Sequence, residues 1–146
     1  MRIIVDADAM PSIPLIENIA RRYGLPCILI SDDTHELRSN YSEVVTVTKG
    51  FQSVDMYLVN MITPGDIVIS QDYGVAVLGL AKQCYVIHPK GFCYTKEHID
   101  SMLAGRHMAS KMRKHGHHTK GPKRRTKEDE ERLMNTLIKQ IEQEMK

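Results

Sequence analysis

Short runs of apolar, mostly β-branched residues alternate along the first 90 residues with stretches in which apolar positions recur every three or four residues. Runs of the first kind are typical of strands buried on both faces, and stretches of the second kind are typical of helices that bury one face. The predicted strands are 3–5, 27–30, 44–47, 67–69 and 85–87, and the predicted helices are about 13–23, 53–62 and 75–80. Strands joined by helical crossovers imply a parallel sheet with helices on both faces. We therefore predict an α/β fold, a three-layer, parallel or mostly parallel sheet of about five strands flanked by helices.

Polar, glycine and proline positions mark the ends of these elements. Ser12 and Ser53 are predicted N-caps, and Gly24 followed by Pro26 ends the first helix. The polar stretch 34–42 is predicted as a loop, or as a loop with a short helix around 35–38.

The last third of the chain has a different pattern. Thr95 is predicted to cap a helix that runs to about Lys114, a loop with Gly and Pro covers 115–125, and Thr126 with Asp129 resembles a capping box that starts a last helix. That helix has one apolar face, which must dock on the domain or on a second subunit in a homodimer. The face consists of Leu133, Leu137, Ile138, Ile141 and Met145. We expect a single domain overall, with a core at 1–94 and a helical C-terminal extension at 95–146 packed on it.

Charge is distributed unevenly along the chain. The net charge is +2, but residues 1–88 carry −4, residues 89–125 carry +8 and residues 126–146 carry −2. The basic segment indicates a polyanionic partner, RNA rather than DNA, although a solvated basic loop would have the same composition. The candidate phosphate contacts are Lys90, Arg106, Arg113, Lys120, Lys123 and Arg124. With no Trp and two Phe, base stacking would fall to tyrosines such as Tyr73 or Tyr94.

Composition also bounds the environment of the protein. The three cysteines form no CxxC motif, so they are expected to be small core residues in a reducing compartment. No apolar segment approaches the ~20 residues of a membrane span, and the first strand begins too early to leave room for a signal peptide. We expect a cytoplasmic protein without a membrane partner.

Acidic residues follow two of the predicted strands. Asp6 and Asp8 come directly after the first strand, Asp72 follows the fourth, and Asp55 lies in the first turn of the helix between strands three and four. If strands one and four are neighbours, these carboxylates converge at the carboxyl end of the sheet, where α/β folds bind ligands. Several carboxylates favour Mg²⁺ or Mn²⁺ over zinc, and Ser70 could add a hydroxyl to a bound water.

Three of these acids also have an ordinary structural explanation. Asp6 could simply end a strand, Asp8 could cap the next helix, and the helix dipole favours an acid at Asp55 by ~0.3–1 kcal/mol. Asp66 lies at the amino end of the fourth strand and is interpreted as a turn residue.

Several motifs resemble one family across nearly the whole chain. Val5–Pro11 closely resembles the VDADACP opening of the YaiI/YqxD family of uncharacterised bacterial proteins, and Gly65–Tyr73 resembles its second signature. Further matches to its C-terminal pattern are Tyr94-Thr95, Leu103–Arg106 and Gly121-Pro122. The family is usually grouped with PIN-like nuclease domains, so the resemblance implies a PIN-like parallel sheet with Asp6, Asp8, Asp55 and Asp72 as candidate metal ligands. The sequence departs from the family pattern at two positions: Met10 replaces a common cysteine, and Gln52 replaces an acid that many members carry.

Three functions fit these features. The first is a divalent-metal-dependent nuclease or phosphodiesterase acting on RNA, in which the four aspartates hold one or two Mg²⁺ or Mn²⁺ ions and water attacks phosphorus. The second is a haloacid-dehalogenase-like phosphatase with Asp6 as nucleophile and Ser31, Lys49 and Asp72 around it, although the chain has no cap domain. The third is a non-catalytic RNA- or ribosome-binding protein with a residual acidic site.

Overall fold

The computed structural model describes residues 1–8, 10–101, 103 and 126–145. The strands are β1 (Ile3–Asp6), β2 (Cys27–Asp32), β3 (Glu43–Val47), β4 (Ile67–Ile69) and β5 (Tyr85–Ile87). The helices are α1 (Ile13–Arg22), α2 (Val54–Met61), α3 (Tyr73–Ala81) and α5 (Lys127–Glu144). Residues 96–101 are also helical. The strands and helices that the sequence predicted in 1–94 are therefore present, with β2 extended to Asp32.

The five strands form one parallel sheet in the order β3-β2-β1-β4-β5. The chain builds outward from β1 to β3 and then returns to place β4 on the other side of β1. Val5 is consequently paired with Leu29 of β2 on one side and with Ile69 of β4 on the other. The strand order reverses between β1 and β4, and in such sheets the crevice at the carboxyl ends of these two strands is the usual ligand site.

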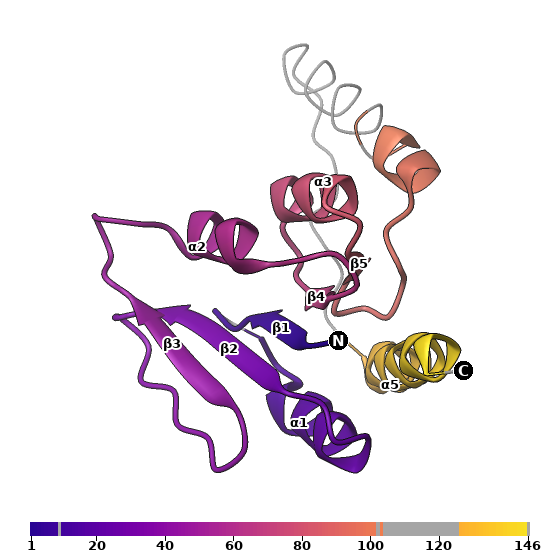
Figure 1. Cartoon of the computed structure of the whole chain (residues 1–146), viewed down its shortest axis with the longest axis horizontal. Coiled ribbons are helices and arrows are strands. Elements are labelled where there is room, and N and C mark those ends of the chain that lie inside the picture. Colours follow the sequence, from indigo (N-terminus) through magenta and orange to yellow (C-terminus); the bar gives the residue numbers. More distant parts are fainter. Residues whose placement is uncertain (9, 102, 104–125, 146) are drawn as a thin grey trace.

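Helices cover both faces of the sheet, as Figure 1 shows, with α1 and α5 on one side and α2 and α3 on the other. Consecutive residues of β1 face opposite layers. Ile3 and Val5 pack in the apolar cluster that includes α1 and α5, whereas Ile4 packs in the cluster that includes α2 and α3. Burial on both faces explains why the strands are continuous apolar runs, and the predicted three-layer α/β fold is confirmed.

The C-terminal helix α5 docks on its own domain. Its capping box is present, because the Asp129 amide donates to Thr126 Oγ1 at 3.2 Å and the Thr126 amide donates to Asp129 Oδ2 at 2.9 Å. The residues that it buries completely against the sheet are Leu133, Leu137 and Ile141. Met145 is 55% exposed, so it does not belong to the buried face. A homodimer through this helix stays a prediction and would have to use its other faces.

The loop after β5 passes very close to α5. Gly91 has a φ of +98°, and a Cβ placed on it would lie 2.5 Å from the carbonyl carbon of Arg132. No side chain fits in that space, so glycine is required both by the backbone conformation and by the contact. This approach fixes the start of α5 against the end of β5.

The predicted caps have different outcomes. Ser53 caps α2, since its hydroxyl accepts a hydrogen bond from the Met56 amide at 3.1 Å, and Thr95 accepts one from the His98 amide at 3.0 Å. Ser12 occupies the predicted N-cap position of α1, but the residue is buried and its side chain makes no capping hydrogen bond to the helix. Stretch 34–42 is a loop, with no helix among these described residues.

Other expectations concern cysteines, membranes and the basic segment. Cys27 and Cys84 are buried free thiols, and Cys93 is half-buried. No helix in the described ranges is long and apolar enough to cross a membrane. The predicted end of the helix near Lys114 and the loop 115–125 lie outside the described residues.

Candidate functional site

The pairing of β1 with β4 brings the predicted acidic residues to one place. A pocket of about 560 Å³ at the carboxyl end of these strands is lined by Asp6, Asp8, Asp55, Gln71, Asp72, Tyr73 and Gly74. We call it the aspartate pocket. It receives side chains from the end of β1, the first turn of α2 and the start of α3. All four predicted aspartates therefore share one pocket, and their role as metal ligands stays a prediction.

Ser70 connects two sides of the aspartate pocket. Its buried hydroxyl donates a hydrogen bond to Asp6 Oδ2 at 3.0 Å and accepts one from the Asp72 amide at 3.0 Å. Ser70 therefore fixes the orientation of Asp6 and the turn that leads to Asp72. Its predicted hydrogen bond to a bound water stays a prediction.

The pKa of Asp6 is raised to about 6. The main cause is burial, which disfavours the charged carboxylate, and the negative charges of Asp55, Asp8 and Asp72 act in the same direction. The hydrogen bond from Ser70 opposes them and lowers the pKa. The surroundings of Asp6 therefore disfavour its charged form. A cation bound nearby would stabilise the charged form and lower the pKa again.

Asp55 and Asp72 interact directly. Burial raises the pKa of Asp55, and so do the charge of Asp72 and a hydrogen bond with it. Asp72 also has a structural role, since its Oδ1 accepts a hydrogen bond from the Val75 amide at 3.0 Å and caps α3. Asp72 is therefore also a helix cap, a role that leaves its second carboxylate oxygen for other partners.

The structure adds two residues that the sequence analysis missed. His35 Nδ1 lies 3.3 Å from Asp8 Oδ1 and 3.1 Å from Asp32 Oδ1, and the Asp32 amide donates to Asp8 Oδ1 at 3.2 Å. Hydrogen bonds from Thr34 lower the pKa of Asp32, and His35 adds to this effect. A signal for Asp32 was available, because it ends β2 as Asp6 ends β1. His35 lies in an irregular loop whose path no periodicity predicts.

The spacing of donor atoms separates these two acidic groups. Ligand atoms of Asp8, Asp32 and His35 all lie within 4.8 Å of one another. Among the described residues this is the only such trio of His, Cys, Asp or Glu side chains, so the four aspartates of the aspartate pocket share a cavity without forming an equally tight set. Asp8 belongs to both groups.

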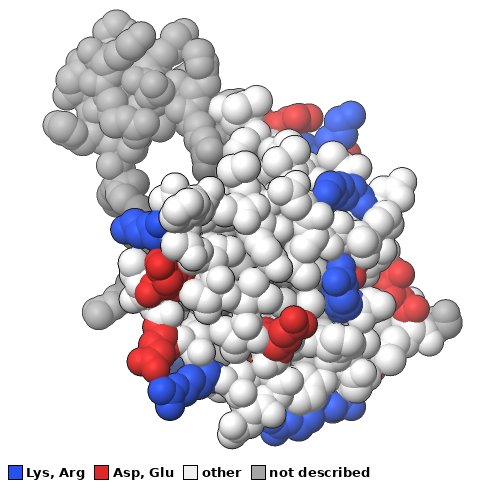
Figure 2. Space-filling model, turned by 60° about the vertical axis from the view of Figure 1, so that its left-hand side comes forward, with Lys and Arg blue, Asp and Glu red and all other residues white. Residues whose placement is uncertain are grey.

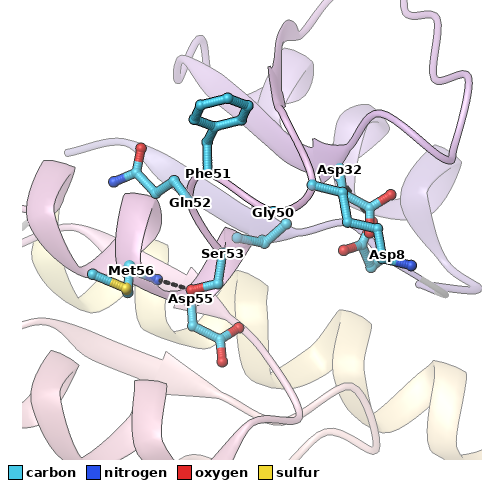
Figure 3. A pocket seen from close by; sticks show the side chains of 10 residues that line it. Asp8, Asp32, Gly50, Phe51, Gln52, Ser53, Asp55 and Met56 are labelled. Carbon is cyan, nitrogen blue, oxygen red and sulfur yellow. Dashed lines mark hydrogen bonds between the residues drawn. The ribbon is translucent and has the colours of Figure 1, made fainter.

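A second pocket, of about 490 Å³, adjoins the first because Asp8 and Asp55 line both (Figure 3). We call it the loop pocket, since the loop between β3 and α2 supplies half of its lining residues. Its other lining residues are Asp32, Lys49, Gly50, Phe51, Gln52, Ser53, Val54 and Met56. In Figure 3 the ring of Phe51 projects outward from the loop, with Asp55 on the other side of the backbone.

Comparison with known proteins identifies the family. Residues 4–143 match the family described as "Uncharacterized BCR, YaiI/YqxD family". The chain belongs to the YaiI/YqxD family.

The YaiI/YqxD relatives are similar in length as well as in sequence. A UPF0178 protein of Clostridium kluyveri is 51% identical over 97% of this chain and 93% of its own length. UPF0178 proteins of Clostridium tetani and Natranaerobius thermophilus are 49% and 44% identical over 94% and 100% of this chain, and over 94% and 99% of their own lengths. No solved structure matches significantly. The resemblance to the family is thus confirmed, and its descriptions name no activity.

The predicted phosphate contacts of this YaiI/YqxD protein are only partly placed. Lys90 lies in the loop after β5, and the described lining of the aspartate pocket does not include it. A hydrogen bond with the Thr126 backbone is the main cause that lowers the pKa of Asp129, and the charge of Lys90 also contributes. The face shown in Figure 2 mixes acidic and basic side chains without a continuous patch of either sign. The remaining candidates, Arg106, Arg113, Lys120, Lys123 and Arg124, lie outside the described residues.

The candidates for base stacking in the YaiI/YqxD protein are also revised. Tyr94 is only 3% exposed and packs edge-on against Phe92 at 5.3 Å, so it cannot offer a ring face to a base. Tyr73 lines the aspartate pocket, as its prediction requires. Phe51, which the sequence analysis did not single out, is 91% exposed at the rim of the loop pocket.

Proposed function

We propose that this protein is a divalent-metal-dependent phosphodiesterase that cleaves RNA, with Asp6, Asp8, Asp55 and Asp72 holding Mg²⁺ or Mn²⁺. The observation that supports this most is the gathering of four carboxylates from separate elements in one pocket at the β1/β4 switch point. Two unit negative charges 4 Å apart repel by roughly 4 kcal/mol at an effective dielectric of 20. A cation would offset this repulsion, and carboxylate oxygens are the donors that Mg²⁺ and Mn²⁺ prefer.

The donor set fits such an ion. Ser70 occupies Asp6 Oδ2 and the Val75 amide occupies Asp72 Oδ1, so both carboxylates are held in fixed orientations. Preorganised ligands of this kind lose little freedom when an ion binds. The raised pKa values of Asp6 and Asp55 are those of carboxylates whose charged form lacks a cationic partner.

The chain's own groups can then be assigned roles in the reaction. The bound metal would polarise a phosphoryl oxygen and make water a better nucleophile. Asp55, whose pKa is raised by burial and by the charge of Asp72, would be a stronger base than an ordinary carboxylate and could accept a proton from the attacking water. Ser70 would act as a positioning residue, because it holds Asp6 and the backbone at Asp72.

Calorimetric titration with Mn²⁺ or Mg²⁺ tests the proposal. Wild-type protein should bind one or two ions saturably, and a D6N/D72N variant should not, because asparagine keeps the shape and the capping bond of Asp72 but removes both charges. D33N is a matched control: it removes one exposed carboxylate whose Oδ1 accepts from the Lys49 amide outside the aspartate pocket. Mn²⁺-dependent cleavage of mixed RNA should disappear in the same double variant. Absence of wild-type binding at millimolar metal would contradict the proposal.

A non-catalytic RNA-binding protein is the second candidate. It is favoured by the wider spacing of the four aspartates and by Gln52 in the loop pocket, where the family resemblance implied an acid. RNA binding that survives both EDTA and D6N, without strand cleavage, would select it. The phosphatase hypothesis loses support because Ser31 is fully buried and lies outside the described lining of both pockets.

A further inference from the structure

Phe51 has the most exposed large apolar side chain among the described residues, at 91%. It lies where the loop pocket opens beside the aspartate pocket, and Met56, which is 60% exposed, lines the same pocket (Figure 3). Phe51 contributes almost no surface to the core. Its position next to a polar cavity therefore points to a ligand with an apolar face and a polar edge.

The backbone holds Phe51 in this position. The Phe51 amide donates to the Thr48 carbonyl at 3.1 Å, which closes a four-residue turn with Gly50 in its third place. Gly50 has a φ of +96°, the conformation that this place of a type II turn requires. The Lys49 amide donates to Asp33 Oδ1 at 3.1 Å and anchors the turn to the end of β2. Phe51 is thus presented by a braced turn.

Beside the carboxylates of Asp8, Asp32 and Asp55, the lining of the loop pocket includes one cation that can pair with a phosphate. Lys49 is the only lysine or arginine among the described residues that line the loop and aspartate pockets, and it lies two positions from Phe51. An aromatic ring that can stack on a base, next to an ammonium group that can pair with its phosphate, is the usual composition of sites for unpaired nucleotides. The volume of about 490 Å³ is also within the range of small-ligand sites.

We propose that the turn 48–51 forms a subsite for one unpaired RNA nucleotide, whose base stacks on Phe51 and whose phosphate pairs with Lys49. Because Asp8 and Asp55 line both pockets, the next phosphodiester along the strand would enter the aspartate pocket. The inference rests on the proposed RNA substrate. It predicts that the protein prefers single-stranded RNA, since the bases of a duplex are stacked on one another and cannot stack on Phe51. It does not depend on cleavage.

Tryptophan fluorescence provides a direct test, because the chain contains no Trp. F51W places a single indole at the subsite, and M145W places one at a residue of 55% exposure at the end of α5. Single-stranded RNA should quench F51W saturably, while duplex RNA and a strand with abasic nucleotides of equal charge should quench it at least about 5-fold less. M145W should show no saturable change. Equal quenching by the abasic strand, or RNA binding seen by anisotropy with no change in F51W, would overturn the subsite.

Binding by variants gives an independent measurement. F51A should weaken single-stranded RNA binding roughly 5- to 100-fold, the range found for loss of one stacked base, and F51Y should restore most of it. Equal RNA affinity of F51A and wild type would overturn the inference. Quenching of F51W when the protein concentration is raised without RNA would also overturn it, because it would indicate that a second copy of the chain binds at Phe51. Metal titration of F51A should match wild type. If wild-type protein binds no metal but RNA still quenches F51W, the proposed catalysis is rejected and the proposed subsite is retained.

Discussion

Asp6 and Asp66 are aspartates at opposite ends of neighbouring strands, and their surroundings move their pKa values in opposite directions. Burial raises the pKa of Asp6 to about 6, with no basic partner among the causes. Asp66 is also buried, which raises its pKa, but hydrogen bonds from Arg2 and Thr63 outweigh this and the pKa is lowered. Asp66 is a paired structural residue, as the sequence indicated, whereas Asp6 forms no ion pair with a lysine or arginine of the described residues.

This difference predicts how stability depends on pH in EDTA. The folded protein favours protonated Asp6, so the stability that Asp6 contributes is complete below pH 3.8 and is lost as the pH rises through about 6. D6N removes this loss. Its free energy of unfolding relative to wild type should therefore be higher at pH 8 than at pH 4, by roughly 1–3 kcal/mol in urea titrations.

D66N is the control with the opposite sign of pKa shift. A lowered carboxyl pKa contributes stability above the unfolded value of 3.8, and this stability is lost only as the pH falls through the still lower folded value. The cost of D66N should therefore be nearly the same at pH 8 and pH 4 and should shrink at lower pH. Saturating Mn²⁺ should cancel the advantage of D6N at pH 8. A D6N variant that is equally destabilised at both pH values would contradict the assignment of Asp6.

At the scale of elements, most of the fold could be predicted because the local patterns agree with the tertiary structure. Continuous apolar runs such as Ile67–Ile69 occur where a strand is covered on both faces. Ser12 shows the limit of such reasoning, since it occupies the predicted N-cap position of α1 but its buried side chain makes no capping hydrogen bond. The contact between Gly91 and α5 joins segments about 40 residues apart, and no local pattern encodes it.

That contact gives a prediction for α5. G91A would force a methyl group into the backbone of Arg132, whereas G65A introduces the same strain at a φ of +90° with nothing within 4 Å. Both should destabilise through the backbone, and G91A should lose about 1–3 kcal/mol more because the helix must move. Urea denaturation followed by circular dichroism measures the difference. Equal losses would mean that the close approach contributes nothing to the docking of α5.

At the scale of the molecule, the sequence placed the acids correctly only on the condition that strands one and four are neighbours. That adjacency depends on the chain reversing its direction of growth after β3, which no residue pattern specifies. Asp32 and His35 were missed for a related reason, since their approach to Asp8 depends on β2 lying beside β1 and on the path of an irregular loop. The uneven distribution of charge along the chain, in contrast, could be read directly from the sequence.

The basic segment predicts the salt dependence of RNA binding. A K120A/K123A/R124A variant should bind RNA more weakly, and its plot of log affinity against log salt should be flatter by roughly 2, because each lost phosphate contact on a single strand removes about 0.7. K90A tests a cation near α5, where it acts on Asp129. If Lys90 also contacts phosphate, as predicted, the slope of log affinity against log salt for K90A should be flatter by about 0.7. An unchanged slope in the triple variant would exclude these three residues as phosphate contacts.

The position of β1 has a consequence for the newly made chain. Asp6 is synthesised before the residues that complete the aspartate pocket. Strand β4, which pairs with β1 at the switch point, begins only at Ile67, and Asp72 follows β4. A ribosome must therefore release more than 60 residues after Asp6 before the carboxylates can meet. The aspartate pocket cannot form until β4 and the turn after it are made, and a chain cut short before β4 would carry Asp6 and Asp8 with no pocket to hold them.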